Sequence, residues 1–175
     1  MTVLPVPQLV PLAVAAAACV TDVRSRRIPN WLTFGSAAAA FGFFLTSQGW
    51  HGLGWSAAGW AVGLVMFLPF FLLRGIGGGD IKLVAALGAW VGPMSAVWVA
   101  LFAAVAGGPL ALALALSKGY ARQAIANLWG LVGYWRLVGI RPHPGLTLEA
   151  AGAGTPRLPY ALPIAVGLVM TLWLR

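Results

Sequence analysis

Two of the three acidic residues in this 175-residue chain are placed where they could do chemistry together. Asp22 ends the first apolar run and Asp80 begins a later one. A charged side chain costs about 2.5 to 3.5 kcal/mol at the centre of a membrane helix, so acids beside such runs indicate function. Two carboxylates held together cannot easily both ionise, so one keeps a proton while the other can take one from water. The pair predicts acid–base hydrolysis of a peptide bond.

Helix dipoles suggest how the two acids divide this work. Asp80 lies at the amino end of its predicted helix, where a negative charge is favoured, and Asp22 lies at the carboxyl end of its own, where it is not. We therefore predict that Asp80 is the ionised base and Asp22 the proton holder. The nearby Arg24, Arg26 and Arg27 act in the opposite sense on Asp22.

Residues near the acids are candidates for substrate positioning. Gly77, Gly78 and Gly79 directly precede Asp80, can adopt positive backbone angles and would let an extended substrate approach closely; the alternative is a plain helix stop. Asn30 could position substrate or simply cap a helix after Pro29. Lys82 could pair with an acid or a lipid phosphate, or extend its amino group to the membrane surface.

Composition places the chain in a membrane. Apolar residues make up 61% and charged residues 8%, whereas soluble proteins carry roughly 25% charged residues. We expect one integral membrane domain over residues 1–175. The net charge of +8 sits in short gaps between apolar runs, which argues against nucleic-acid binding. We expect no metal and no cofactor, because His51 and His143 fall on opposite sides of the membrane and Cys19, read as buried and inert, is the only cysteine.

The predicted fold is all-α, a polytopic bundle of six transmembrane helices. At about 1.5 Å per residue most of the apolar segments can cross a core of about 30 Å. The segments are Val3–Val20, Trp31–Ser47, Trp55–Leu73, Ile81–Val91, Met94–Leu116 and Leu158–Leu174. The fourth reaches only about 16 Å, so Asp80 should lie below the headgroups in a thinned or water-accessible pocket.

Loop charges predict the orientation. Ten of the eleven Lys and Arg residues fall in the first, third and fifth loops, which places these loops in the cytoplasm and both termini outside. The second loop, Gln48–Gly54, carries no Lys or Arg. Residues 118–157 should form a cytoplasmic or interfacial segment. Within it Ile125–Ile140 reads as an interfacial helix, because its aromatic residues favour the headgroup level, with a seventh span as the alternative. Arg141–Pro159 reads as a loop.

Two separated motifs carry a resemblance to a known family. Asp22–Asn30, followed by Gly77–Leu83, resembles the paired signature of type IV prepilin peptidases, which are membrane aspartic proteases of the Gly-x-Gly-Asp class. The similarity covers Val10–Val91 and resumes at Leu158-Pro159-Tyr160, which resembles the opening of that family's last helix, although Ala161 stands where a glycine is frequent.

The resemblance implies what the protein does and where. Asp22 and Asp80 would be the catalytic pair, cutting a prepilin or pseudopilin after the glycine that ends a short basic leader. The site would lie on the cytoplasmic side of the bacterial inner membrane, with the lipid bilayer and pilus-assembly proteins as further partners. The chain lacks the cysteine-rich loop of longer members, so it resembles the short Flp, or tight-adherence, type, for which we expect no methyltransferase activity.

Two other classes of function remain open from the residues alone. The acids could form a relay in a proton- or cation-coupled carrier, which would need acids at successive depths in the membrane. They could instead pair with Arg or Lys of a partner helix in a noncatalytic assembly subunit. The expected placement of both acids at one face favours the peptidase.

Overall fold

The computed structural model describes residues 6–72, 76–117, 119, 121–138 and 160–174. Every regular element within these ranges is a helix, which confirms the predicted all-α class. The helices are α1 Val6–Ser25, α2 Asn30–Leu72, α3 Gly78–Val91, α4 Pro93–Ser117, α5 Ala121–Val138 and α6 Ala161–Trp173. Arg74, His143, Glu149 and the expected loop Arg141–Pro159 lie outside the described residues.

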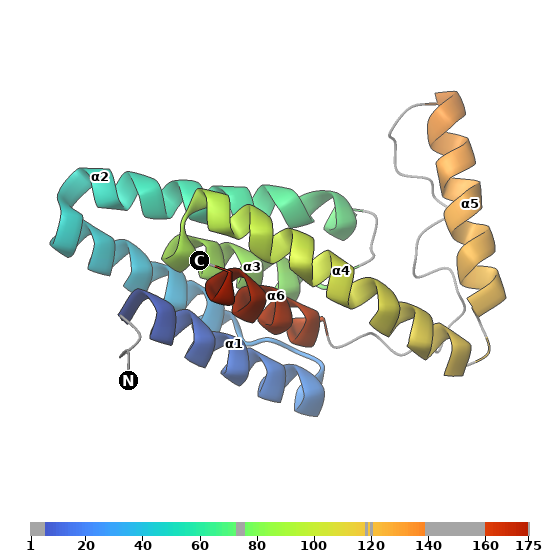
Figure 1. The fold of residues 1–175 in the computed structure, drawn as a ribbon, viewed down its shortest axis with the longest axis horizontal. Helices are drawn as coiled ribbons and strands as arrows, with labels where there is room; N and C mark the ends of the chain where they lie inside the picture. The colour runs from blue at the N-terminus through green and yellow to red at the C-terminus, as the bar shows by residue number, and fades with distance from the viewer. Residues whose placement is uncertain (1–5, 73–75, 118, 120, 139–159, 175) are drawn as a thin grey trace.

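The longest helix, α2, folds back on itself into two arms (Figure 1). Its 43 residues would measure about 65 Å if straight, roughly twice the thickness of a bilayer core. Gly49 breaks it with φ 65° and ψ −153°, a backbone region that glycine enters readily. Rings of Phe44 and Trp55 pack across the reversal at 5.0 Å. The predicted loop Gln48–Gly54 is therefore wrong, since the chain is helical there except for this one break.

Within the described residues, three helices are long and apolar enough to cross a membrane. They are α1, α2 and the Pro93–Ala113 part of α4, and α6 is a shorter apolar helix of 13 residues. The protein is thus a membrane protein by the length and composition of its helices. The amino end of α1 and the carboxyl end of α6 lie at the same end of the bundle (Figure 1).

The short helix α3 forms the core of the bundle. From Asp80 to Val91 only Lys82 is not buried. Glycines bring α3 against the second arm of α2: a Cβ atom on Gly59 would collide with the Gly88 carbonyl, and one on Gly63 would lie 2.6 Å from the Val84 oxygen. Small residues at such contacts let membrane helices pack through their backbones.

Buried polar groups in the core are satisfied by bonds between helices. The Ser56 hydroxyl donates to the Ala89 carbonyl at 2.7 Å. The Trp90 indole donates to the Ser36 carbonyl and hydroxyl, each at 3.1 Å. In an apolar environment an unpaired group of this kind would cost several kcal/mol, so these bonds hold the register of α2 against α3.

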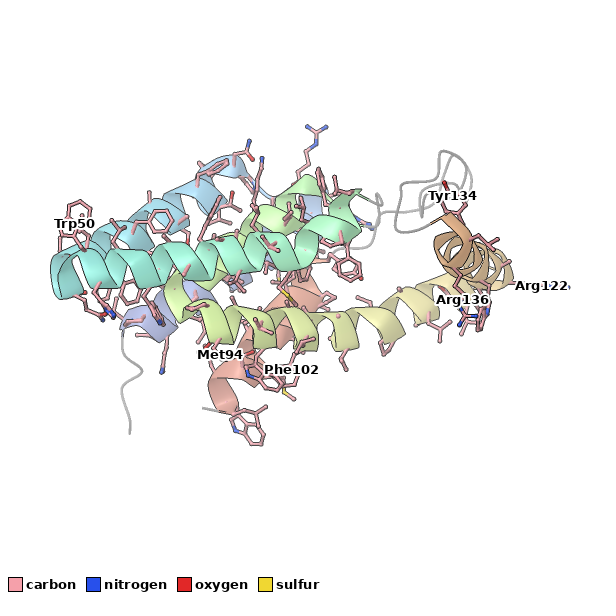
Figure 2. All side chains as sticks on the ribbon, turned by 90° about the horizontal axis from the view of Figure 1, so that it is seen from above. Trp50, Met94, Phe102, Arg122, Tyr134 and Arg136 are labelled. Atoms are coloured by element: carbon pink, nitrogen blue, oxygen red, sulfur yellow. The ribbon has the colours of Figure 1, made fainter. Side chains whose placement is uncertain are left out.

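Helix α5 stands apart, crosswise to the bundle beyond the end of α4 (Figure 1). Arg122, Tyr134 and Arg136 lie on this helix, which Figure 2 shows at the far end of α4, and 71% of Trp129 is exposed. The predicted helix Ile125–Ile140 corresponds to α5, displaced by a few residues.

The glycine contact between α2 and α3 predicts a selective loss of stability. Gly59→Ala should lower the free energy of unfolding by about 1 to 3 kcal/mol, because the new methyl group meets backbone that cannot move aside. Thermal unfolding in detergent, followed by tryptophan fluorescence, measures the effect. Gly54→Ala is the matched control, since a Cβ atom there has nothing within 4 Å. Equal unfolding temperatures for the two variants would contradict the packing account.

Candidate active site

Asp22 lies in the last turns of α1 and is only 7% exposed. Its carboxylate accepts a hydrogen bond at 3.3 Å from the backbone N–H of Ala161, the first residue of α6. Cys19, one turn earlier, donates its thiol to the Ala161 carbonyl at 3.3 Å. Helix α1 thus holds both the N–H and the C=O of Ala161. The expected inert, buried Cys19 is instead half-buried and bonded to α6.

Asp80 lies in the first turn of α3 and is 8% exposed. Its carboxylate accepts the backbone N–H of Gly77 at 3.1 Å, while its own N–H donates to the Gly77 carbonyl at 3.1 Å. The two bonds close a tight turn that fixes the direction of the side chain. A buried carboxylate with a charge-assisted partner of this kind is held firmly in place.

The structure brings the two acids to one end of the bundle. The charge of Asp22 acts on Asp80, and α1 packs directly against α3. The charge of Asp22 also acts on Cys19, and that of Asp80 acts on Tyr160. Two buried carboxylates from separate helices therefore share one polar cluster with a thiol and a phenol, and this cluster can bind and activate water.

Tyr160, the residue that precedes α6, is the member of the cluster that sequence reasoning missed. A Cβ atom on Gly107 of α4 would lie 3.1 Å from the phenol oxygen, so the hydroxyl fits against bare backbone. Burial, and then the charge of Asp80, raise the pKa of the Tyr160 phenol. The available signals were the Leu158-Pro159-Tyr160 segment and the pair Gly107-Gly108.

The position of Asp22 removes the basis of the predicted division of roles. The dipole argument assumed that Asp22 faces only the carboxyl end of α1. Its side chain also bonds the first N–H of α6, and the amino end of a helix favours negative charge. Asp80 has the same kind of environment at the start of α3. Helix dipoles therefore do not distinguish the base from the acid.

The glycines before Asp80 do not adopt the positive backbone angles that were expected. Gly77 has φ −77° and ψ 154°, and Gly78 and Gly79 already belong to α3; among the described glycines, positive φ occurs elsewhere. A Cβ atom on Gly79 would lie 3.1 Å from the Cβ of Ile28. The absence of a side chain at Gly79 therefore lets the start of α3 approach the α1–α2 connection.

The two other predicted positioning residues bond each other. The Lys82 amino group donates to the Asn30 side-chain oxygen at 3.0 Å and lies 5.3 Å from the centroid of the Phe34 ring. Asn30 is the first residue of α2. The pair connects the starts of α2 and α3. The sequence suggested an acid or a lipid phosphate as the partner of Lys82, whereas in the structure its amino group bonds the Asn30 amide oxygen.

The described part of the chain has cavities in at least two places. One of about 310 Å³ is lined by Cys19, Val20, Val23 and Arg24, which flank Asp22 on α1. The other, about 380 Å³, lies between the start of α4 and the end of α6, near Met94 and Phe102 (Figure 2). The first cavity adjoins the polar cluster, and the second is lined mainly by apolar side chains.

Comparison with protein families decides the identity. A model of the type IV leader peptidase family matches residues 9–112, a range that contains both acids, the Gly77–Gly79 run and Lys82. The chain belongs to the type IV leader peptidase family. No curated protein and no solved structure matches the chain significantly. Membership in this leader peptidase family confirms the resemblance drawn from the two motifs and implies aspartic protease activity in general.

The contact of Gly79 with Ile28 predicts that neighbouring glycines respond differently to substitution. Gly79→Ala should destabilise the protein by about 1 to 3 kcal/mol, because Ile28 must give way. Gly78→Ala should be tolerated, since its new methyl group would make an ordinary contact, 3.5 Å from Phe71. Thermal unfolding in detergent compares the two. If Gly78→Ala proved the more damaging, the packing role of Gly79 would be wrong.

Proposed function

We propose that this leader peptidase is an intramembrane aspartic endopeptidase that removes the short basic leader from prepilin-like proteins, cutting after a glycine on the cytoplasmic side. The observation that carries the proposal is that two buried carboxylates, Asp22 from α1 and Asp80 from α3, lie close enough for the charge of one to act on the other. The family match supports peptide hydrolysis. Both acids lie within the matched residues.

In the proposed reaction, one carboxylate takes a proton from a water molecule whose oxygen attacks the scissile carbonyl carbon. The other carboxyl group gives its proton to the carbonyl oxygen, which forms a neutral tetrahedral diol. A proton then passes to the leaving nitrogen as the carbon–nitrogen bond breaks. Asp22 and Asp80 can each play either part, since each accepts one backbone N–H. Gly77, Gly78, Gly79, Lys82 and Asn30 remain proposed positioning residues around them.

The proposed placement has six crossings: α1, the two arms of α2, α3, α4 and α6. Both termini lie outside, the acids face the cytoplasm, and residues 1–175 form one domain in the bacterial inner membrane. The basic residues support this orientation, since ten of the eleven belong to the loops on the side of the acids. Helix α3, at about 21 Å, is shorter than the hydrocarbon core, which would place Asp80 below the headgroups. Helix α5 would then lie along the cytoplasmic surface.

The proposed substrate is a prepilin or pseudopilin, and pilus-assembly proteins would take the product. A basic leader is not attracted by the cationic loops, so the two acids and the lipid phosphates would supply the attraction. A carrier is less well supported, because the acids among the described residues are Asp22 and Asp80 and both lie at one end of the bundle.

Replacing either acid is expected to cause a sharp loss of leader processing. Asp22→Asn and Asp80→Asn should each slow leader removal by about a thousandfold or more, because each removes one half of the acid–base pair. The measurement is co-expression with a prepilin whose basic leader ends in glycine, followed by mass spectrometry of the pilin.

Glu149→Gln is the matched control, since it neutralises the remaining acid of the chain and should leave processing intact. Processing that persists in both aspartate variants would reject an aspartic protease. Absence of processing by the wild-type protein, across several prepilins with such leaders, would reject the proposed substrate class.

A further inference from the structure

The start of α6 bonds one acid of the pair and lies within the electrostatic influence of the other. Ala161 donates its backbone N–H to Asp22. Tyr160, the adjacent residue, has its phenol within the electrostatic influence of Asp80. Two adjacent residues, which lie outside the family match, are thus each associated with one of the two acids.

The phenol of Tyr160 is placed by a glycine on a third helix. A Cβ atom on Gly107 would lie 3.1 Å from the hydroxyl oxygen and 3.2 Å from each of two neighbouring ring carbons. The contact therefore involves the tip of the phenol. Gly108, the next residue, has nothing within 4 Å of its Cβ position. Of these two neighbouring glycines, only Gly107 is in close contact with the phenol.

In peptide hydrolysis by two carboxylates, the negative charge on the carbonyl oxygen must also be stabilised, and the acid pair does this only in part. Negative charge develops on the carbonyl oxygen while water attacks, before proton transfer to that oxygen is complete. A fixed hydrogen-bond donor aimed at this oxygen lowers the barrier, and loss of one such donor typically costs about a hundredfold to a thousandfold in rate. The ionised acid cannot serve, because a carboxylate only accepts, and the protonated acid gives up its one hydrogen to this oxygen during the same step.

Resting on the function proposed above, we propose that Tyr160 is a third catalytic residue, whose hydroxyl donates a hydrogen bond to the scissile carbonyl oxygen beside Asp80. The phenol keeps its own proton throughout. Water still supplies the hydroxyl that adds to the carbonyl carbon, and the proton lost by that water still reaches the leaving nitrogen through the carboxyl groups. Tyr160 only stabilises the charge that builds up during the first step.

The surroundings of the phenol suit this role. Its half-buried position and the nearby charge of Asp80 both disfavour the phenolate, so the hydroxyl remains a donor at neutral pH. Because the ring tip is held against Gly107, the hydroxyl does not have to reorganise during the reaction. Preorganised donors of this kind stabilise a transition state more than a mobile side chain does.

The decisive variant is Tyr160→Phe, which keeps the ring and removes only the hydroxyl. With purified full-length protein in detergent and a prepilin substrate, we expect kcat to fall by about a hundredfold while KM changes less than about threefold. The unfolding temperature should match that of the wild type. A Tyr160→Phe protein with wild-type kcat would overturn the proposal, as would a loss seen only in KM or only in thermal stability.

Two glycine variants test the placement of the phenol. Gly107→Ala should lower kcat by about tenfold, because the methyl group displaces the hydroxyl by a few tenths of an ångström. Gly108→Ala, one residue along the same helix, should leave kcat unchanged. In the Tyr160→Phe background, Gly107→Ala should have a smaller effect than in the wild type, since the displaced hydroxyl is gone. Equal effects in both backgrounds would assign Gly107 to packing alone and contradict the proposed placement.

These outcomes separate the two proposals. If the wild-type protein cleaves prepilin and both aspartate variants fail, the proposed function stands whatever Tyr160→Phe does. If the wild-type protein cleaves no prepilin, the proposed function is wrong, and the inference about Tyr160 is rejected with it. The inference about Tyr160 fails by itself when Tyr160→Phe cleaves as fast as the wild type.

Discussion

Two carboxylates buried in an apolar bundle impose the main constraint on this molecule, because each needs a hydrogen-bond donor that the apolar side chains cannot provide. The backbone supplies both. Asp80 takes the N–H of Gly77 within its own turn, and Asp22 takes the N–H of Ala161 across to another helix. The first N–H groups of a helix have no partner inside it, so the start of α6 is a natural donor. The hydrogen bond that satisfies the Asp22 carboxylate therefore also fixes the start of α6 against α1.

That placement depends on how closely the helices approach. Helix α3 can lie at the centre because Gly59, Gly63 and Gly88 bring its backbone against α2. On the opposite side, Gly167 of α6 meets the backbone of α4 at Val99, where a Cβ atom would lie 2.5 Å from the carbonyl oxygen. In a membrane, where burial of apolar surface provides little driving force between helices, such contacts provide much of the packing. The placement of the two acids thus depends on small residues at the helix contacts.

The polar cluster joins elements that are separated in the chain. Helix α1 contributes Asp22 and Cys19, α3 contributes Asp80, and the turn before α6 contributes Tyr160. Lys82 and Asn30 bond at 3.0 Å and connect the starts of α2 and α3. Since three separate elements hold these groups, a shift of any one of them changes the environment of the acids. This arrangement explains why residues without chemistry of their own, such as Gly79 and Ile28, contribute to the site.

The sequence by itself determined the helical class, the main apolar segments and the leader peptidase family, and it singled out Asp22 and Asp80 as the candidate pair. These features are local: hydropathy over about twenty residues marks a span, and an acid beside an apolar run is conspicuous. Only the tertiary structure decided the break at Gly49, the pairing of Lys82 with Asn30 and the placement of Tyr160 against Gly107. It also showed that Asp22 faces the start of α6, 139 residues away. A contact over such a separation depends on how helices pack, and packing leaves little trace in the spacing of residues along one helix.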